Sequence, residues 1–250
     1  MNLKNNNNQN EASYKIIHKS KNYHINLIRR PSESIKDNND YKFTFDSKSI
    51  QDTKTNETQN YDSIIPQSTQ NKEFFEKYIK NNISFFLKGV NISIFVYGQT
   101  NSGKSFTMKG DQKSNEGMIP LTLKEIFMNL NKKNCLINKY TLKISYIEIY
   151  NEVVNDLLDS TKKNLEIRET LIKGPFVNGI SEIVVTNIDK AIQIFNKGLS
   201  NETKSNDKGS KTNTIFRINI EFFAKDKNSN KESKFFSQFN LVELDGSEYV

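Results

Sequence analysis

The stretch GQTNSGKSFTMKG, residues 98–110, has the spacing of a phosphate-binding loop, G-x-x-x-x-G-K-[ST]. Its four fixed positions are Gly98, Gly103, Lys104 and Ser105. Residues 92–97, just before the loop, are β-branched and aromatic, as in a buried strand. A strand, the loop and then a helix is the context that this motif requires, because backbone N–H groups at a helix start bind phosphate. The sequence therefore predicts nucleotide binding here.

Two side chains give this loop its chemistry. We expect Lys104 to reach the β- and γ-phosphates of a nucleotide and the Ser105 hydroxyl to bind Mg²⁺. Hydrolysis needs further groups, which place the attacking water and sense the γ-phosphate. Residues 239–246, FNLVELDG, have the form of a buried strand that ends in an acidic residue and a glycine, the usual source of such groups. An ordinary strand followed by a turn has the same form, so this segment alone does not decide.

Composition limits the class of protein. The length of 250 residues suits one large domain or two small ones. The net charge of +7 favours an acidic partner, such as nucleic acid, an anionic membrane face or an acidic protein polymer, but a lysine-rich solvated surface explains it equally well. With one cysteine, Cys135, neither an internal disulfide nor a cysteine-based metal site is expected. No apolar run approaches the roughly 20 residues of a membrane helix, which predicts a soluble intracellular protein.

The apolar pattern predicts strands interleaved with helices after residue 21, and hence a three-layer α/β domain. Strands are expected at 24–28, 41–45, 92–97, 140–150, 165–168, 183–185, 214–223 and 235–244. Helices are expected at 71–87, 120–130 and 188–199, the last with Asn187 as its N-cap. Residues 1–21 are an Asn/Lys-rich tail, expected to be disordered, and residues 46–60 a low-complexity surface loop.

Several motifs in series resemble the kinesin motor domain. The segment SYIEIYNEVVNDLLD, residues 145–159, is similar to that family's S-Y-x-E-I-Y-N-E-x-x-x-D-L-L signature. The segment LVELDGSE, residues 241–248, is similar to its switch II motif, L-V-D-L-A-G-S-E. Further family segments are similar to the phosphate loop and to INLIRRP, EGMIP and LEIRE. The resemblance runs in order from about His24 to Val250. The resemblance implies a kinesin-type P-loop NTPase over residues 22–250, with a central mixed β-sheet flanked by helices.

The resemblance also implies a function. It predicts a motor domain that binds ATP and Mg²⁺, hydrolyses ATP with stimulation by microtubules, and works in the cytoplasm on the cytoskeleton. Membrane and nucleic-acid partners are not expected, no coiled coil is recognised, and the oligomeric state is left open. One alternative is a motor-derived module that holds nucleotide or tubulin with little or no turnover. Another, a P-loop enzyme acting on nucleic acid, is disfavoured by the downstream motifs.

The resemblance assigns nucleotide contacts residue by residue. The residues around the phosphates are Gly98, Gln99, Thr100, Asn101, Ser102, Gly103, Lys104 and Ser105. Arg30 and Pro31 would border the adenine, and Phe106 would lie near the base.

Two switch segments complete the implied site. Switch I, N-x-x-S-S-R-S-H in the family, falls on Asn206, Gly209, Ser210, Lys211, Thr212 and Asn213. Ser210 would be a second Mg²⁺ ligand, and Asn206 would help to sense the γ-phosphate. In switch II, the Gly246 amide would bind the γ-phosphate, and Glu248 would pair with Lys211.

The chain departs from the family pattern within these switches. Lys211 replaces an arginine, so its pairing with Glu248 should be weaker and less directional. Gly209 removes a hydroxyl that would help to hold the attacking water. Glu243 replaces an aspartate beside the Mg²⁺, and Ile28 replaces an arginine on the adenine side. We expect these changes to weaken hydrolysis more than nucleotide binding.

The position of Val250 is a further departure. In the family, switch II is followed by the main microtubule-contacting loop and helices, a further strand within the central sheet, and the linker that moves the load. We therefore expect either a piece of a longer product or an incomplete motor with an unfilled place in its sheet.

Overall fold

A computed structural model describes most of the chain. The described residues are 13–19, 23–29, 41–43, 48–52, 55–66, 68–111, 115–132, 137–171, 174–203, 212–225 and 232–246. Among them, no helix is long and apolar enough to cross a membrane.

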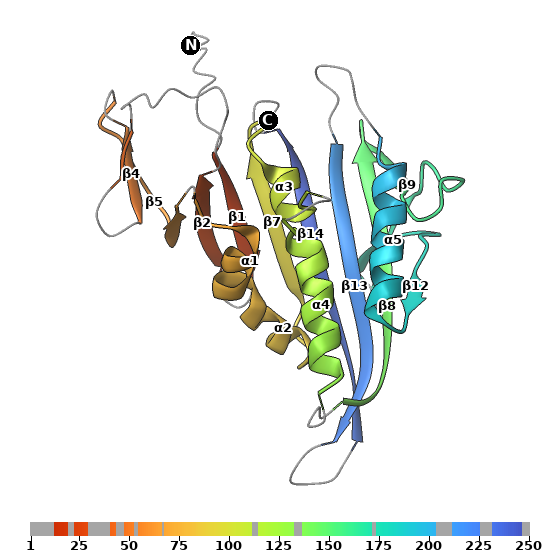
Figure 1. Ribbon diagram of the computed structural model, residues 1–250. Coiled ribbons are helices and arrows are strands. Elements are labelled where there is room, and N and C mark those ends of the chain that lie inside the picture. The colour runs from red at the N-terminus through yellow and green to blue at the C-terminus, as the bar shows by residue number, and fades with distance from the viewer. Residues whose placement is uncertain are drawn as a thin grey trace.

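The centre of the molecule is a nine-stranded mixed sheet (Figure 1). In spatial order its strands are β12 (Ile183–Val185), β8 (Ile137–Tyr150), β13 (Thr212–Lys225), β14 (Glu232–Gly246), β7 (Ile92–Gly98), β1 (Ser13–Lys19), β2 (Tyr23–Arg29) and β6 (Ser63–Ile65), and β9 (Val153–Asp156) pairs with β8. β7 and β14 pair in parallel, as do β2 and β6, whereas the other neighbours are antiparallel. The expected mixed central sheet is confirmed.

The described helices cover one face of this sheet, side by side in front of it in Figure 1. They are α1 (Asn71–Phe74), the π-helical turn η1 (Phe75–Ile79), α2 (Lys80–Phe86), α3 (Lys104–Met108), α4 (Met118–Leu130) and α5 (Ile188–Asn201). Alternate strand side chains point at the helices and are fully buried, as the period of a strand requires. They include Ile94, Val96, Ile144, Phe216, Ile218 and Phe239. Of the three expected layers, the described residues thus supply the sheet and one helical layer.

Most of the expected elements are present, and some begin or end a few residues away. Asn187 caps α5 as expected, because its side chain accepts a hydrogen bond from the Lys190 N–H at 2.9 Å. The strand expected at 165–168 is β10 (Ile167–Thr170), which forms a hairpin with β11 (Gly174–Val177). The helix expected from residue 71 is present as three consecutive segments: α1, the π-helical turn η1 and α2.

Two stretches expected to lack regular structure contain strands. Residues 46–60 were predicted to be a loop, but they contain β4 (Ser49–Asp52) and β5 (Thr58–Asn60). In a small antiparallel sheet, β4 pairs with β3 (Tyr41–Phe43) on one side and with β5 on the other. β5 is exposed at every residue and is defined by its backbone pairing. Backbone pairing leaves no apolar pattern in the sequence. Similarly, β1 lies inside the tail expected to be disordered.

β1 joins two parts of the central sheet. It pairs antiparallel with β2 on one side and with β7 on the other, over the residue pairs Ile16↔Asn26 and Ile16↔Val96 among others. The central sheet is therefore continuous across its described strands, and the expected unfilled place is not found there. β2 follows β1 directly in the chain, whereas β7 is remote in sequence, so local pattern does not predict that β1 lies between them.

The parallel pairing of β7 and β14 places their carboxyl ends at one edge of the sheet. Gly98 ends β7 and lies opposite Gly246, which ends β14, with Glu243 opposite Val96. Loops that follow neighbouring parallel strands meet at such an edge, which is where α/β proteins bind ligands. This pairing brings the phosphate loop and the FNLVELDG segment together.

Candidate nucleotide site

The phosphate loop connects β7 to α3 in the strand–loop–helix order that the motif predicts. Gly103 precedes α3 with φ 88°, a left-handed conformation that favours glycine, and no side chain of a described residue caps the helix start. The first turn of α3 is therefore directed at whatever occupies the loop.

Lys104 is folded back over the loop. Its Nζ donates hydrogen bonds to the Gly98 and Gln99 carbonyl oxygens at 2.8 and 2.9 Å, and the residue is only 8% exposed. The ammonium thus bridges the beginning of the loop to the beginning of the helix. The role of Lys104 towards phosphate stays a prediction.

Ser105 and Glu243 contact each other across the two parallel strand ends. The Ser105 hydroxyl donates a hydrogen bond to Glu243 Oε1. The structure thus brings the predicted metal ligand to the acidic residue of the FNLVELDG strand, as the switch II resemblance implies. Their catalytic and metal-binding roles remain predictions.

Lys109, which the sequence analysis did not select, forms ion pairs with two carboxylates beside this contact. Its Nζ lies 3.0 Å from Glu243 Oε2 and 2.7 Å from Glu202 Oε2. Burial lowers the pKa of Lys109, but the Glu243 and Glu202 carboxylates raise it by more, so the net shift is upward and the ammonium is retained. One buried cation therefore neutralises carboxylates from β14 and from the end of α5.

Tyr146 extends this network across the core. Its hydroxyl donates to Glu202 Oε1, and the side chain is fully buried under α5. Burial and the Glu202 carboxylate raise the pKa of Tyr146 well above its ordinary value. The hydroxyl therefore stays protonated and remains a donor.

The start of β13 is tied to the end of β14 next to this site. Asn213 Oδ1 accepts a hydrogen bond from the Asp245 N–H at 2.9 Å. Asp245 Oδ2 is buried and has no hydrogen-bond partner among the described residues, and Gly246 is buried beside it. Asn213, the last switch I position, thus fixes the backbone that precedes Gly246.

Glu148, in the signature segment, anchors the residue after Glu202. Its carboxylate accepts hydrogen bonds from Thr203 N and Thr203 Oγ1 at 2.9 and 2.6 Å. Asp156 in the same segment is buried and accepts backbone N–H groups from Leu158 and Ser181. The signature segment therefore has a structural role here.

Only some of the predicted site residues are among the described residues. Gly98 to Phe106, Glu243 and Gly246 lie together at the edge formed by β7 and β14. The Phe106 carbonyl accepts a hydrogen bond from Asn71 Nδ2 at 2.9 Å, which ties α3 to α1. Other predicted site residues lie outside the described residues, namely Arg30, Pro31, Asn206, Gly209, Ser210, Lys211 and Glu248.

A local signal for Lys109 does exist in the sequence. Lys109 follows Ser105 by four residues, so the two share one face at the end of α3. Tyr146 stands at a fixed position of the signature segment. No comparable signal marks Glu202, because it reaches the site through tertiary packing.

Comparison with known proteins agrees with this geometry. A family model described as the kinesin motor domain matches residues 3–250. The chain belongs to this family. The kinesin-like protein KIN-7D, chloroplastic, of Oryza sativa subsp. japonica is 38% identical over 192 residues, 75% of this chain and 19% of the relative. Kinesin-related protein 7 of Dictyostelium discoideum is 36% identical over 231 residues, 88% of this chain and 18% of the relative.

A solved structure shares the fold of this kinesin motor domain. It is that of a fast kinesin, described with implications for ATPase mechanism and interactions with microtubules. The TM-score is 0.71 at 28% identity, over 84% of this chain and 60% of that one. This chain therefore spans about a fifth of the curated relatives just named and under two thirds of the solved chain.

Proposed function

We propose that this kinesin motor domain binds ATP with Mg²⁺ and hydrolyses ATP, with stimulation by microtubules, in the cytoplasm. The observation that carries the proposal is the contact of Ser105 with Glu243 beside Lys104, at the joined ends of β7 and β14. Bound Mg²⁺–ATP would supply the phosphoryl group and the charge neutralisation that its transfer needs.

The described residues fit such a ligand. Lys104 donates to the neutral carbonyl oxygens of Gly98 and Gln99, and anionic phosphate oxygens are stronger partners for an ammonium. While it donates a hydrogen bond to Glu243, the Ser105 hydroxyl keeps lone pairs with which it can bind a cation. The buried, unpartnered Asp245 Oδ2 adds acceptor capacity near Gly246.

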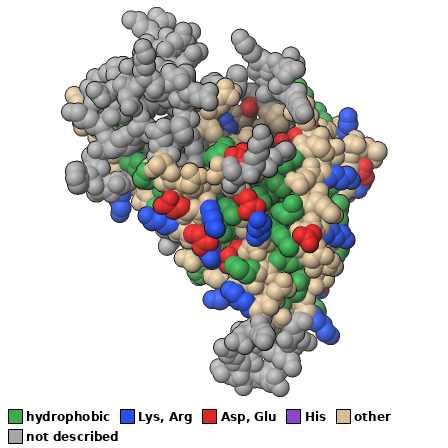
Figure 2. All heavy atoms as spheres, viewed as in Figure 1, with side chains coloured by type: hydrophobic (Ala, Val, Ile, Leu, Met, Phe, Trp, Pro, Cys, Tyr) green, Lys and Arg blue, Asp and Glu red, His purple; other side chains and the backbone are tan. Residues whose placement is uncertain are grey.

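The remaining roles rest on the family resemblance. Arg30, Pro31 and Phe106 would hold the adenine. Ser210 would be a second Mg²⁺ ligand, Asn206 and the Gly246 amide would sense the γ-phosphate, and Lys211 would pair with Glu248. The surface charge does not decide the partner: Figure 2 shows basic and acidic side chains interspersed over the helical face.

A motor-derived binding module without useful turnover is the second candidate. It is favoured by Glu243, whose longer side chain replaces the family aspartate and is held by both Ser105 and Lys109. In a site where a misplacement of about 1 Å can cost ~100-fold in rate, this change bears on hydrolysis more than on binding.

The experiment is a steady-state measurement of phosphate release from ATP by the purified protein, alone, with microtubules, and with single-stranded DNA as a polyanion control. We expect stimulation by microtubules only. Lys104→Met should abolish nucleotide binding, whereas Lys124→Met, a half-exposed lysine on α4 paired with Glu116, should not. Nucleotide binding without stimulation would favour the binding module. Stimulation by DNA would favour the nucleic-acid enzyme. Absence of nucleotide binding would contradict both nucleotide-dependent proposals.

A further inference from the structure

The buried ion pairs of Lys109 join three elements that are remote in sequence. The lysine follows α3, Glu243 lies in β14, and Glu202 follows α5. All three side chains are largely buried, with exposed fractions of 15%, 11% and 19%. Charges removed from water this far require partners, and each carboxylate here has the same cation as a partner.

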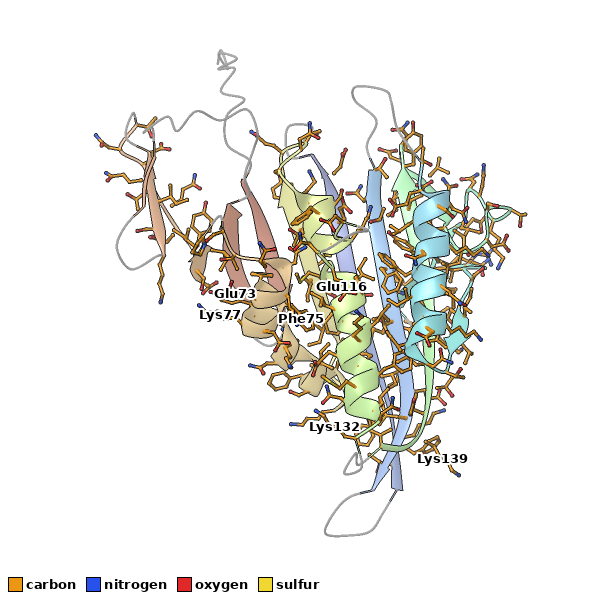
Figure 3. The ribbon with its side chains drawn as sticks, in the orientation of Figure 1. Glu73, Phe75, Lys77, Glu116, Lys132 and Lys139 are labelled. Atoms are coloured by element: carbon orange, nitrogen blue, oxygen red, sulfur yellow. The ribbon has the colours of Figure 1, made fainter. Side chains whose placement is uncertain are left out.

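The backbone of Lys109 is held rigidly in this position. Its N–H donates to the Ser105 carbonyl at 2.7 Å, which fixes the lysine relative to the predicted metal ligand. Gly117 packs against it so closely that an added Cβ would lie 2.4 Å from the Lys109 carbonyl carbon. Gly110 pairs with Glu116, which Figure 3 labels at the start of α4. The backbone position from which the Lys109 side chain reaches the two carboxylates is therefore fixed.

Glu202 is fixed from the opposite side. Tyr146 donates to one of its carboxylate oxygens while Lys109 Nζ lies at the other. The next residue, Thr203, is held by Glu148. The point at which the chain leaves α5 towards residues 204–211 is thus connected to the Ser105–Glu243 contact through one lysine.

We propose that Lys109 is a positioning residue, which holds the Glu243 carboxylate on Ser105 and couples that contact to the end of α5 at Glu202. Glutamate has one more rotatable bond than aspartate, so its carboxylate needs a second anchor to stay at one point. Lys109 is that anchor: it occupies Oε2 and leaves Oε1 for the Ser105 hydroxyl. The inference rests on the proposed function, since it assumes that Ser105 binds the Mg²⁺ of a bound nucleotide.

The test measures how much Mg²⁺ the protein needs to retain a fluorescent ADP analogue, with binding in EDTA as a separate readout. The Lys109→Met substitution roughly keeps the length of the side chain and removes its charge. We expect its half-saturating Mg²⁺ concentration to rise by about tenfold or more, the range seen when residues that orient metal ligands are lost. Affinity in EDTA should be unchanged, because Lys104 and the loop are intact.

Three further variants separate positioning from general stability. Lys109→Arg keeps the charge and should stay within about threefold of the wild type, well short of the loss expected for removal of an orienting group. Lys124→Met is the matched surface control and should have no effect. If Lys109→Met does not fold, Lys109→Gln, which is polar but uncharged, carries the same expectation.

The outcomes for this inference and for the proposed function are distinct. If the wild type binds the analogue with a Mg²⁺ requirement that Lys109→Met leaves unchanged, the positioning role is wrong and nucleotide binding stands. If Lys109→Met lowers affinity equally with Mg²⁺ and in EDTA, the lysine supports the fold and not Glu243, which also overturns the inference. If the wild type binds no nucleotide, the proposed function is wrong, and the inference that rests on it is wrong as well.

Discussion

The ring of Tyr146 packs directly on the backbone of α5 at Gly198. A Cβ atom added to Gly198 would lie 2.3 Å from Cδ1 and 2.9 Å from Cε1 of that ring. One helical turn later, Glu202 receives the hydroxyl of the same tyrosine. The glycine therefore sets how closely α5 approaches β8, and with it where Glu202 lies.

We expect Gly198→Ala to lower the free energy of unfolding by about 1–2 kcal/mol. Overpacking costs about 1–3 kcal/mol, and the 2.3 Å approach puts Gly198 in the upper part of that range, while alanine gains about 1 kcal/mol in helix propensity. The ring cannot move away easily, because Phe195 and Phe216 pack against it. Urea unfolding measures the change. Asn196→Ala, exposed on the same helix, is the control and should change stability by less than about 0.5 kcal/mol. A Gly198→Ala protein as stable as the wild type would contradict this packing.

Asp156 should be one of the most sensitive polar residues of the fold. Its carboxylate accepts backbone N–H groups of Leu158 at 2.8 Å and Ser181 at 2.7 Å, and the residue is 2% exposed. Asp156→Ala leaves these two donors without this partner, at about 1–3 kcal/mol each, so we expect a loss of at least about 2 kcal/mol in urea unfolding. Glu169→Ala, at an exposed position of β10, is the control. A loss below about 1 kcal/mol would show that water replaces the carboxylate.

Stability should depend on pH through Asp159. Hydrogen bonds from the Thr161 hydroxyl and N–H lower the pKa of Asp159 in the folded state. The resulting stabilisation is present above the unfolded-state pKa of about 3.9 and is lost as pH falls through the folded-state pKa. Thr161→Ala should therefore be less stable than the wild type at pH 6, and the difference should shrink at about pH 2.5. Ser200→Ala, whose hydroxyl donates to a backbone carbonyl, should show no such trend. A pH-independent difference for Thr161→Ala would rule out the carboxylate as the cause.

The resemblance also predicts that Lys211→Arg raises ATP turnover. Arginine can grip the Glu248 carboxylate with two parallel hydrogen bonds, and lysine cannot. Microtubule-stimulated phosphate release measures the effect, with Lys211→Met as the comparison that removes the charge. An unchanged rate in both variants would argue that the pair with Glu248 does not form.

Local pattern was enough to predict the elements that carry the phosphate loop. The β-branched run before Gly98, the glycine spacing and the acidic end of residues 239–246 each reflect a requirement of one segment, and the structure contains β7, α3 and β14 there. Asn187 is a similar case, since an N-cap depends on bonds to residues of its own helix.

Features that depend on remote partners were not predictable from these patterns. Nothing in the apolar period of residues 71–87 distinguishes η1 from an α-helical turn. β1 pairs with β7, which is remote in sequence, and β5, exposed at every residue, is defined by backbone pairing with β4. Glu202 reaches Lys109 only because α5 packs against Tyr146, so its part in the site depends on the assembled core.

The contact between Ser105 and Glu243 also has a consequence for biosynthesis. The two residues are 138 positions apart, and β7, which precedes the loop and Ser105, is a direct neighbour of β14, which contains Glu243. Such long-range pairing forms slowly and cannot begin until the later strand has left the ribosome. During most of translation the phosphate loop therefore exists without its acidic partner, and β7 has an unpaired edge. A nascent chain halted before residue 232 should expose that edge to chaperones or to aggregation, and nucleotide added at that stage could not rescue it through Glu243.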